Sequence, residues 1–448
     1  MYTGAMIRLR FFGSLLFLLV FAILPGARAQ KAPTFDAEFQ RFWSAKSPQE
    51  AAQRADDVVK SGITFDEALR RLKAGRPYAP QASGVIWLSN RTEDGVEHHY
   101  AVNVPSGYDP AQRYQVRFQL HGGVGGRTDN KPRGNGEIGA LAGAEQFYVL
   151  PYSWQDAPWW SDDQVLNLNA IVDVLKRTYN IDENRVALSG VSDGGTGAYY
   201  IAMRDTTPFA SFLPLNGFIM VLANAEISDG GIFANNLRDK PLFVVNGGRD
   251  RLYPISNVEP FTRHLMAGGV FIDYHPQPEG EHNTRWWPEV KDAFEKFVAD
   301  HPRDPHPDKL TWEARSGSAN NRAHWLVIDQ FGAAPGEKDL PDLNVFAEDG
   351  PGETLFDKAP ATGRVDLVRK GNTVEATTKG VASFTLLLSP DKFDLSQPVR
   401  VVANGREVFN ARVQPNLKTL MKWAARDNDR TMLYAAELSL KLRRQEVR

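Results

Sequence analysis

A glycine-rich turn between an apolar segment and a helix-forming segment is the feature that most constrains the fold of this chain. The apolar segment is Arg185–Leu188, and the turn at Gly190–Gly195 reads G-V-S-D-G-G. A strand that bends sharply into a helix needs glycines on both sides of the bend, because side chains there would collide. The same bend exposes Ser192 at the edge of a sheet, beside the positive end of the helix that follows. The pattern therefore predicts a strand–turn–helix unit that presents a reactive hydroxyl.

Strand-like and helix-like segments alternate on both sides of this turn. The expected strands are 84–89, 96–104, 114–120, 146–150, 185–188, 212–215, 241–246 and 270–275, and the expected helices are 162–179, 194–204, 256–267 and 287–300. The first two strands flank a turn-rich stretch and are expected to form a hairpin. The later alternation predicts an α/β fold, with a doubly wound, mostly parallel sheet covered by helices on both faces. We assign this catalytic domain to residues 81–305.

The first 29 residues have the pattern of a signal peptide. Arg8 and Arg10 precede the apolar run Phe11–Leu24, and Ala27–Ala29 supplies a small-x-small cleavage site. The run is shorter than the roughly 20 residues of a comfortable membrane span. The pattern predicts a periplasmic or secreted protein that is not held at the membrane after cleavage. The absence of cysteine excludes disulfides and a cysteine nucleophile.

Two further regions flank the expected catalytic domain. Residues 30–80 are predicted to be helical, because Ser47–Glu50 is a capping box and Thr64 can cap a second helix. These helices are either an accessory layer or a lid over the site. The proline-rich stretch 301–307 is interpreted as a linker. Beyond it, residues 306–448 are predicted to form an all-β, sandwich-like domain, with expected strands at 324–330, 364–369, 373–377, 383–389 and 399–402, a closing strand through residues 438–442, and one helix at 417–425.

An acidic partner for the serine is expected after a later strand. On sheets with such a serine turn the order along the chain is serine, acid, histidine. The strand 241–245 runs into the loop N-G-G-R-D, which places Asp250 where a carboxylate can orient an imidazole. Asp229 and Asp239 precede that strand, and Asp273 lies inside the next one. Asp250 is therefore the predicted acid.

The general base is expected among the histidines that follow Asp250. His282 lies in the loop beyond strand 270–275, whereas His275 ends that strand. A loop residue can reach the serine hydroxyl more easily, so His282 is predicted and His275 is the alternative. In these roles His282 takes the proton of Ser192, Asp250 holds the imidazole tautomer, and Ser192 forms an acyl-enzyme.

A second glycine-rich loop is expected to help stabilise the oxyanion. The loop His121–Gly126 reads H-G-G-V-G-G and follows an expected strand. Its glycines let the backbone approach a substrate closely. The predicted oxyanion donors are the backbone N–H groups of Gly123, Val124 and Asp193. His121 precedes the serine, the wrong order for a base, and is expected to be a structural hydrogen bonder.

Four tryptophans near these loops are candidates for substrate contact: Trp154, Trp159, Trp160 and Trp286. Stacking on sugar or aryl groups is one interpretation, and core packing is an alternative of equal weight. No histidine–carboxylate spacing indicates a metal, so we predict no metal and no cofactor. With 52 Lys+Arg against 54 Asp+Glu and no basic stripe, nucleic acid is not an expected partner.

Three motifs together resemble a known group of enzymes. Leu120–Gly123 (L-H-G-G), Gly190–Gly195 and Gly280–Asn283 (G-E-H-N) look like the corresponding stretches of secreted serine esterases of the polyhydroxybutyrate-depolymerase and feruloyl-esterase type, within the α/β-hydrolase superfamily. The resemblance covers roughly residues 84–300. It implies hydrolysis of carboxylic esters, with small-molecule or polymeric substrates such as acylated plant polysaccharides or polyesters. Such enzymes often carry disulfides and this chain has no cysteine, which leaves the substrate open.

Two other functions remain open at this point. A serine peptidase resembling the prolyl oligopeptidase family shares the serine motif and the order of the triad, but such peptidases usually carry a large propeller before the catalytic domain. A non-catalytic protein that binds carbohydrate on the β-domain is the other. The intact set of Ser192, Asp250 and His282 argues against it.

Overall fold

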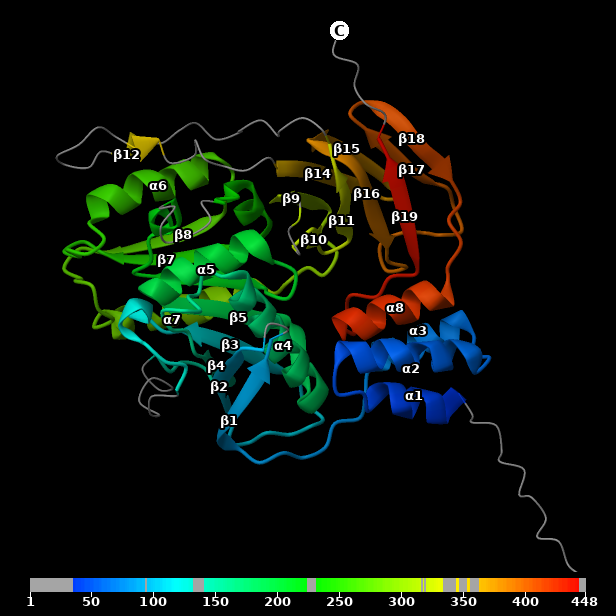
Figure 1. The fold of residues 1–448 in the computed structure, drawn as a ribbon, viewed down its shortest axis with the longest axis horizontal. Helices are drawn as coiled ribbons and strands as arrows, with labels where there is room; N and C mark the ends of the chain where they lie inside the picture. The colour runs from blue at the N-terminus through cyan, green and yellow to red at the C-terminus, as the bar shows by residue number, and fades with distance from the viewer. Residues whose placement is uncertain are drawn as a thin grey trace, which may run out of the picture.

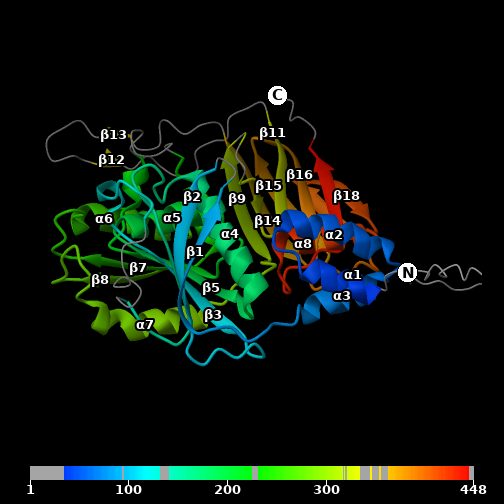
Figure 2. The same ribbon diagram turned by 60° about the horizontal axis from the view of Figure 1, so that its bottom comes forward.

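The computed structural model describes residues 35–92, 95–131, 141–223, 231–315, 317, 320–332, 344–345, 353–354 and 362–442. The predicted signal peptide, residues 1–29, lies outside these ranges. Within them, no helix is both long enough and apolar enough to cross a membrane. Figures 1 and 2 show a mixed α/β sheet with its helices, a set of strands beside it, and a small group of helices.

The α/β part is built on one eight-stranded sheet with the order β1-β2-β4-β3-β5-β6-β7-β8. The antiparallel strands β1 and β2 form the expected hairpin, and β2 is also antiparallel to β4. Strands β3 to β8 run parallel to one another. The bounds are β1 Gly84–Arg91, β2 Glu97–Val104, β3 Tyr114–Leu120, β4 Phe147–Pro151, β5 Ile181–Val191, β6 Ser211–Leu215, β7 Leu242–Gly247 and β8 Ile272–Gln277. The mostly parallel sheet predicted from the alternation of segments is confirmed.

Helices cover both faces of this sheet because alternate strand residues point to opposite sides. On β5, Val186 and Leu188 join the apolar cluster that includes α4, α5 and α6, whereas Ala187 joins the cluster built on α7. The bounds are α4 Asp162–Thr178, α5 Asp193–Arg204, α6 Ile255–Ala267 and α7 Trp287–Asp300, with short 3₁₀ turns at Val124–Gly126, Ile219–Ala223 and Ala234–Asp239. The sheet is therefore held rigidly from both sides.

The C-terminal strands form two further sheets, with the orders β10-β11-β16-β19 and β18-β17-β15-β14-β9, which share one apolar core. The bounds are β9 Lys309–Arg315, β10 Arg322–Ala323, β11 Leu326–Phe331, β14 Thr362–Lys370, β15 Thr373–Lys379, β16 Val381–Leu388, β17 Val399–Ala403, β18 Arg406–Ala411 and β19 Ala436–Lys441. A separate pair joins β12 Asn344–Val345 to β13 Glu353–Thr354. The hairpin turn at Asn404–Gly405 has positive φ at both residues, as a type I′ turn requires.

The N-terminal helices pack on the C-terminal part of the chain. They are α1 Phe35–Trp43, α2 Pro48–Lys60 and α3 Phe65–Ala74, and they share an apolar cluster with α8 Leu417–Asp427. Ser47 caps α2 by accepting from Glu50 N, as predicted. Arg177 in the last turn of α4 donates to Ala45 O at 3.0 Å, and α4 leads into the first residue of β5. The helices thus lie toward the amino ends of the strands, away from Ser192, and do not form the lid that the sequence left open.

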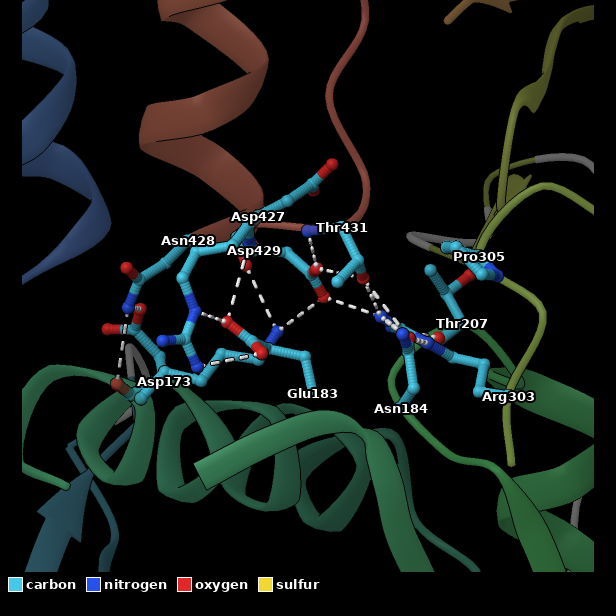
Figure 3. Close-up of polar contacts among 12 residues, drawn as sticks. Asp173, Glu183, Asn184, Thr207, Arg303, Pro305, Asp427, Asn428, Asp429 and Thr431 are labelled. Carbon is cyan, nitrogen blue, oxygen red and sulfur yellow. Dashed lines mark hydrogen bonds and ion pairs between the residues drawn. The ribbon is translucent and has the colours of Figure 1, made fainter. Parts of the chain in front are cut away.

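The proline-rich stretch 301–307, which the sequence analysis interprets as a linker, is packed against the parts that it connects. Arg303 within it is buried and donates to Asp429 Oδ2 at 2.8 Å and to Asn184 Oδ1. Lys176 Nζ lies 3.1 Å from the same Asp429 oxygen. Figure 3 shows these contacts between α4, the start of β5 and the segment after α8. Proline restricts the backbone of the stretch, and Arg303 holds the stretch between the α/β part and the β part. We call this contact region around Asp429 the seam.

Candidate active site

The turn between β5 and α5 has the strained geometry that its sequence predicts. Ser192 has φ 56° and ψ −118°, outside the regions that most residues adopt. A Cβ on Gly190 would lie 2.1 Å from Gly194 O, and a Cβ on Gly194 would lie 2.2 Å from Leu120 O. Ser192 N donates to Leu215 O on the neighbouring strand at 2.9 Å. Both glycines are therefore required by backbone contacts, and the bend holds Ser192 at the carboxyl ends of the strands.

Ser192, His282 and Asp250 form a continuous hydrogen-bonded chain. Ser192 Oγ lies 2.8 Å from His282 Nε2, and His282 Nδ1 lies 2.6 Å from Asp250 Oδ2. The other carboxylate oxygen, Asp250 Oδ1, accepts from Leu252 N at 2.8 Å and Tyr253 N at 2.9 Å. Asp250 is buried while the His282 side chain is 24% exposed. The carboxylate thus holds the Nδ1–H tautomer of His282, which leaves Nε2 free to accept the serine proton.

Backbone contacts hold the loop of the histidine against the loop of the aspartate. Gly248 N donates to Gln277 O at 2.7 Å, and Arg249 N donates to Gly280 O at 2.8 Å. From the other side, Asn216 Nδ2 donates to Asn283 O at 2.8 Å. Asn216 has φ 47°, a left-handed conformation that asparagine tolerates. In the sequence, its position before Gly217 at the end of an expected strand is the signal that marks it.

Tyr253 also belongs to the site and was not singled out from the sequence. Its ring lies edge-on to that of His282, with centroids 5.2 Å apart. Burial, with a further contribution from the charge of Asp193, raises the pKa of Tyr253 to about 12, so the hydroxyl stays protonated. Tyr253 therefore limits the movement of the imidazole.

The predicted oxyanion donors do not all remain available. Val124 N donates to Asp193 Oδ2 at 2.7 Å, so this amide is already occupied and the prediction for Val124 is corrected. Gly123, with φ 66°, keeps open space around it, and Asp193 N is a first-turn amide that the helix leaves without an internal acceptor. A Cβ on Gly122 would lie 3.0 Å from Ser192 Cβ, which shows how closely this loop approaches the serine.

His121 is a structural residue, as predicted. Its Nδ1 lies 2.9 Å from Gly122 O, and its Nε2 accepts from Ser153 N at 3.0 Å. Donation from Nδ1 and acceptance at Nε2 require one neutral tautomer. The alternative base, His275, does not take the place of His282, whose Nε2 is the histidine nitrogen bonded to Ser192 Oγ. The ring of His275 stacks on Phe243 with centroids 4.4 Å apart.

Three of the four candidate tryptophans are core residues. Trp159 is fully buried and donates from Nε1 to His121 O at 2.8 Å, while Trp154 and Trp286 are 6% and 4% exposed. Because their ring faces are covered by protein, stacking on a substrate is wrong for these three. Trp160 is partly buried against the core and is the one of the four that keeps an accessible surface.

The other acidic candidates do not belong to the site as the structure describes it. Asp239 precedes β7, at the amino ends of the strands, and its Oδ1 accepts from Thr311 N at 2.9 Å. Asp273 lies on β8. Asp229 is not among the described residues. Among the residues that are described, no group of three or more histidine, aspartate and glutamate side chains could hold a metal ion.

The chain is similar to known proteins over part of its length. No protein-family model matches the chain. It is 27% identical over 179 residues to a bifunctional acetylxylan esterase/xylanase from Neocallimastix patriciarum, covering 39% of this chain and 24% of the relative. It is 25% identical over 171 residues to a probable feruloyl esterase C from Aspergillus terreus, covering 36% and 62%. The chain thus spans less than two thirds of either relative.

Solved structures show only weak likeness. A thermostable esterase has a TM-score of 0.38 at 22% identity, covering 49% of this chain and 63% of that one. The apo form of Thermogutta terrifontis esterase 2 has a TM-score of 0.40 at 14% identity, covering 49% and 96%. A putative dipeptidyl aminopeptidase IV from Bacteroides ovatus has 0.41 at 14%, covering 49% and 36%. These scores are too low to carry an argument. Both curated relatives are esterases by name, so the predicted resemblance to carboxylic ester hydrolases is confirmed.

Proposed function

We propose that this protein is an exported serine hydrolase that cleaves carboxylic esters through an acyl-enzyme on Ser192. The observation that carries the proposal is the unbroken chain from Ser192 Oγ through His282 to the buried Asp250. Nucleophile, base and orienting acid lie within hydrogen-bond reach of one another, as covalent acyl transfer requires. The esterase names of the curated relatives support the same chemistry.

The roles of the three residues follow from this geometry. Ser192 Oγ attacks the ester carbonyl while His282 Nε2 takes its proton, and Asp250 stabilises the resulting imidazolium. The amides of Asp193 and Gly123 are the proposed donors to the oxyanion. The tetrahedral intermediate then expels the alcohol, which receives the proton held on His282. Water, deprotonated by the same imidazole, attacks the acyl-enzyme and releases the acid and free Ser192.

Acyl or feruloyl esters of plant polysaccharides, or polyesters, are the proposed substrate classes. The support comes from the names of the curated relatives, one an acetylxylan esterase and the other a probable feruloyl esterase. Trp160 is the remaining aromatic candidate for contact with a sugar or aryl group. We further propose that residues 1–29 direct export, that 81–305 form the catalytic domain, and that 30–80 and 306–448 are accessory regions.

Ester hydrolysis by the purified protein and by Ser192→Ala tests the proposal. The substrates are p-nitrophenyl acetate, butyrate and octanoate, methyl ferulate and a dipeptidyl amide. Ser106→Ala is the matched control, since Ser106 lies on the surface and bonds Glu145. We expect Ser192→Ala to lose at least about 10⁴-fold in kcat, as removal of a triad serine does, and Ser106→Ala to keep full activity. Equal rates in wild type and Ser192→Ala would refute the triad, and cleavage of the amide alone would favour a peptidase.

A further inference from the structure

The end of strand β6 is hydrogen-bonded to the serine turn and to the strand that precedes the acid. Leu215, the last residue of β6, accepts from Ser192 N at 2.9 Å. The next residue, Asn216, donates from its backbone N to Val245 O on β7 at 2.7 Å, and β7 runs into the loop of Asp250. Backbone groups thus fix the end of β6 relative to both the nucleophile and the acid.

The side chain of Asn216 adds the connection to the base. Its Nδ2 donates at 2.8 Å to the backbone oxygen of Asn283, the residue that follows His282. Asn216 is fully buried, and a buried hydrogen bond is stronger than one in water. On the other side of His282, Gly280 O accepts from Arg249 N at 2.8 Å. The main chain of the histidine loop is therefore held both before and after the imidazole.

The turn that carries Asn216 is supported by the helix that begins at the serine. Asn216 has φ 47°, and the residue after it, Gly217, packs against the first turn of α5. A Cβ on Gly217 would lie 2.6 Å from the carbonyl carbon of Gly195. Asn246 Nδ2, at the end of β7, donates to Gly217 O at 3.2 Å. The amide of Asn216 is thus presented by a rigid turn that moves together with the serine.

The hydrogen bonding of the Asn216 amide indicates a role other than stability. Its Oδ1 is buried and has no hydrogen-bond partner within the described part of the chain. A buried acceptor without a donor is unfavourable by an amount comparable to the stabilisation that one hydrogen bond contributes. The two halves of the amide therefore nearly offset each other in the free energy of folding. What remains of the side chain's effect is the position that it imposes on Asn283.

We propose that Asn216 is a positioning residue that sets the distance between His282 Nε2 and Ser192 Oγ. The serine turn and the histidine loop are both bonded to residues 215–216, so loss of the Nδ2 contact lets the loop move relative to the turn. Proton transfer requires hydrogen-bond distance, and a misplacement of about 1 Å can lower a rate by about 100-fold. This inference rests on the proposed ester hydrolysis, because its effect on kcat is measured in that reaction.

Asn216→Gly tests the proposal in the full chain, because glycine adopts the positive φ of this position without strain and removes only the side chain. We expect kcat for p-nitrophenyl acetate to fall about 10- to 100-fold with little change in KM. We expect Tm to fall by less than about 5 °C. The matched control is Asn404→Gly, another asparagine with positive φ, whose side chain bonds Thr378 in a hairpin of the β part. This control should keep full activity.

A second readout follows His282 without any substrate. The proton on its Nδ1, which is hydrogen-bonded to Asp250 Oδ2, is observed by NMR of protein labelled with ¹⁵N-histidine and is assigned by its loss in His282→Ala. We expect this proton to exchange with water at least about tenfold faster in Asn216→Gly than in wild type, because a loop that has lost an anchor opens more often. In Asn404→Gly the exchange rate should equal that of wild type.

The outcomes separate this inference from the function on which it rests. Wild-type rates that do not depend on Ser192 would refute ester hydrolysis at this site, and the ring proton of His282 would still decide the role of Asn216. If hydrolysis does depend on Ser192, an unchanged kcat or an unchanged ring proton in Asn216→Gly would overturn the positioning role alone. Should the glycine variant fail to fold, Asn216→Asp replaces it with the same expectations, because it keeps the volume but sets a carboxylate oxygen against Asn283 O.

Discussion

At the scale of single residues, Asp193 has two tasks in the candidate site. Its backbone amide is one of the proposed donors to the oxyanion, and its carboxylate accepts from Val124 N at 2.7 Å. The second contact fixes the loop that carries Gly123 relative to the turn that carries Ser192. Sequence reasoning could assign the amide, because the start of a helix fixes its direction. It could not assign the carboxylate, because the position of Val124 depends on how two distant loops pack.

Two replacements of Asp193 distinguish the effect of its negative charge from that of its hydrogen bond with Val124 N. Asp193→Asn keeps an oxygen that can accept from Val124 N, so we expect kcat for p-nitrophenyl acetate within about threefold of wild type. Asp193→Ala removes the acceptor and lets the loop shift, and we expect kcat to fall about 10- to 100-fold with little change in KM, less than the loss of a direct oxyanion donor. Equal activity of Asp193→Ala and wild type would show that the contact does not position the loop.

A single methyl group added at Gly194 tests whether the serine turn requires glycine there. A Cβ on Gly194 would meet Leu120 O at 2.2 Å, so Gly194→Ala forces the backbone apart. We expect a loss of about 3 kcal/mol in the free energy of unfolding, as for overpacked cores, together with loss of activity. The control is Gly125→Ala, which has open space around its Cβ position. Urea unfolding measures the stability of both variants, and similar stabilities would contradict the predicted clash at Gly194.

At the scale of elements, apolar patterning predicted the eight strands of the α/β part, but it missed five C-terminal strands: β9, the short β10, β12 and β13, and β18. β9 was not expected because it carries charged residues and begins directly after the proline-rich stretch. β18 was not expected because it is an edge strand whose side chains are nearly all exposed, so it has no apolar face to recognise. The order serine, acid, histidine predicted which three side chains meet. Asn216 and Tyr253 were missed because their roles arise from contacts between loops.

The stretch 301–307 should give stability a pH dependence. Burial lowers the pKa of His306 to about 4, from 6.5 in an unfolded chain. Between these values the unfolded state binds the additional proton, so stability is full above pH 6.5 and falls as pH drops toward 4, by about 3 kcal/mol. His306→Gln should flatten this dependence in urea unfolding at pH 4.5 to 7. The same slope in the variant would mean that His306 is not neutral in the fold.

At the scale of the whole molecule, the seam between the α/β part and the β part rests on Asp429. Burial alone would raise the pKa of Asp429, yet Arg303 and Lys176 hold it well below its usual value. Next along the chain, Arg430 donates to Glu183 Oε2 on β5 at 2.9 Å. Because the helices α1–α3 pack on α8 in the same region, the three parts of the chain are expected to unfold together.

Removing the shared carboxylate should therefore destabilise the whole chain. Asp429→Ala removes the carboxylate that two buried cations, Arg303 and Lys176, share, and we expect a loss of about 3–5 kcal/mol in one cooperative transition. The control is Asp391→Ala, whose carboxylate pairs with Lys73 at the surface and should matter by less than about 1 kcal/mol. Two separate transitions for wild type in calorimetry would contradict a common unit.

The proposed chemistry requires that Ser192 is the nucleophile and that His282 activates it. The most direct measurement is peptide mapping by mass spectrometry after brief reaction with diethyl p-nitrophenyl phosphate, which phosphorylates an activated serine whatever the natural substrate. We expect one modified residue, Ser192, with labelling abolished in Ser192→Ala, at least about 100-fold slower in His282→Ala, and unchanged in Ser106→Ala. An unlabelled protein, or labelling that persists at the same rate in His282→Ala, would contradict it.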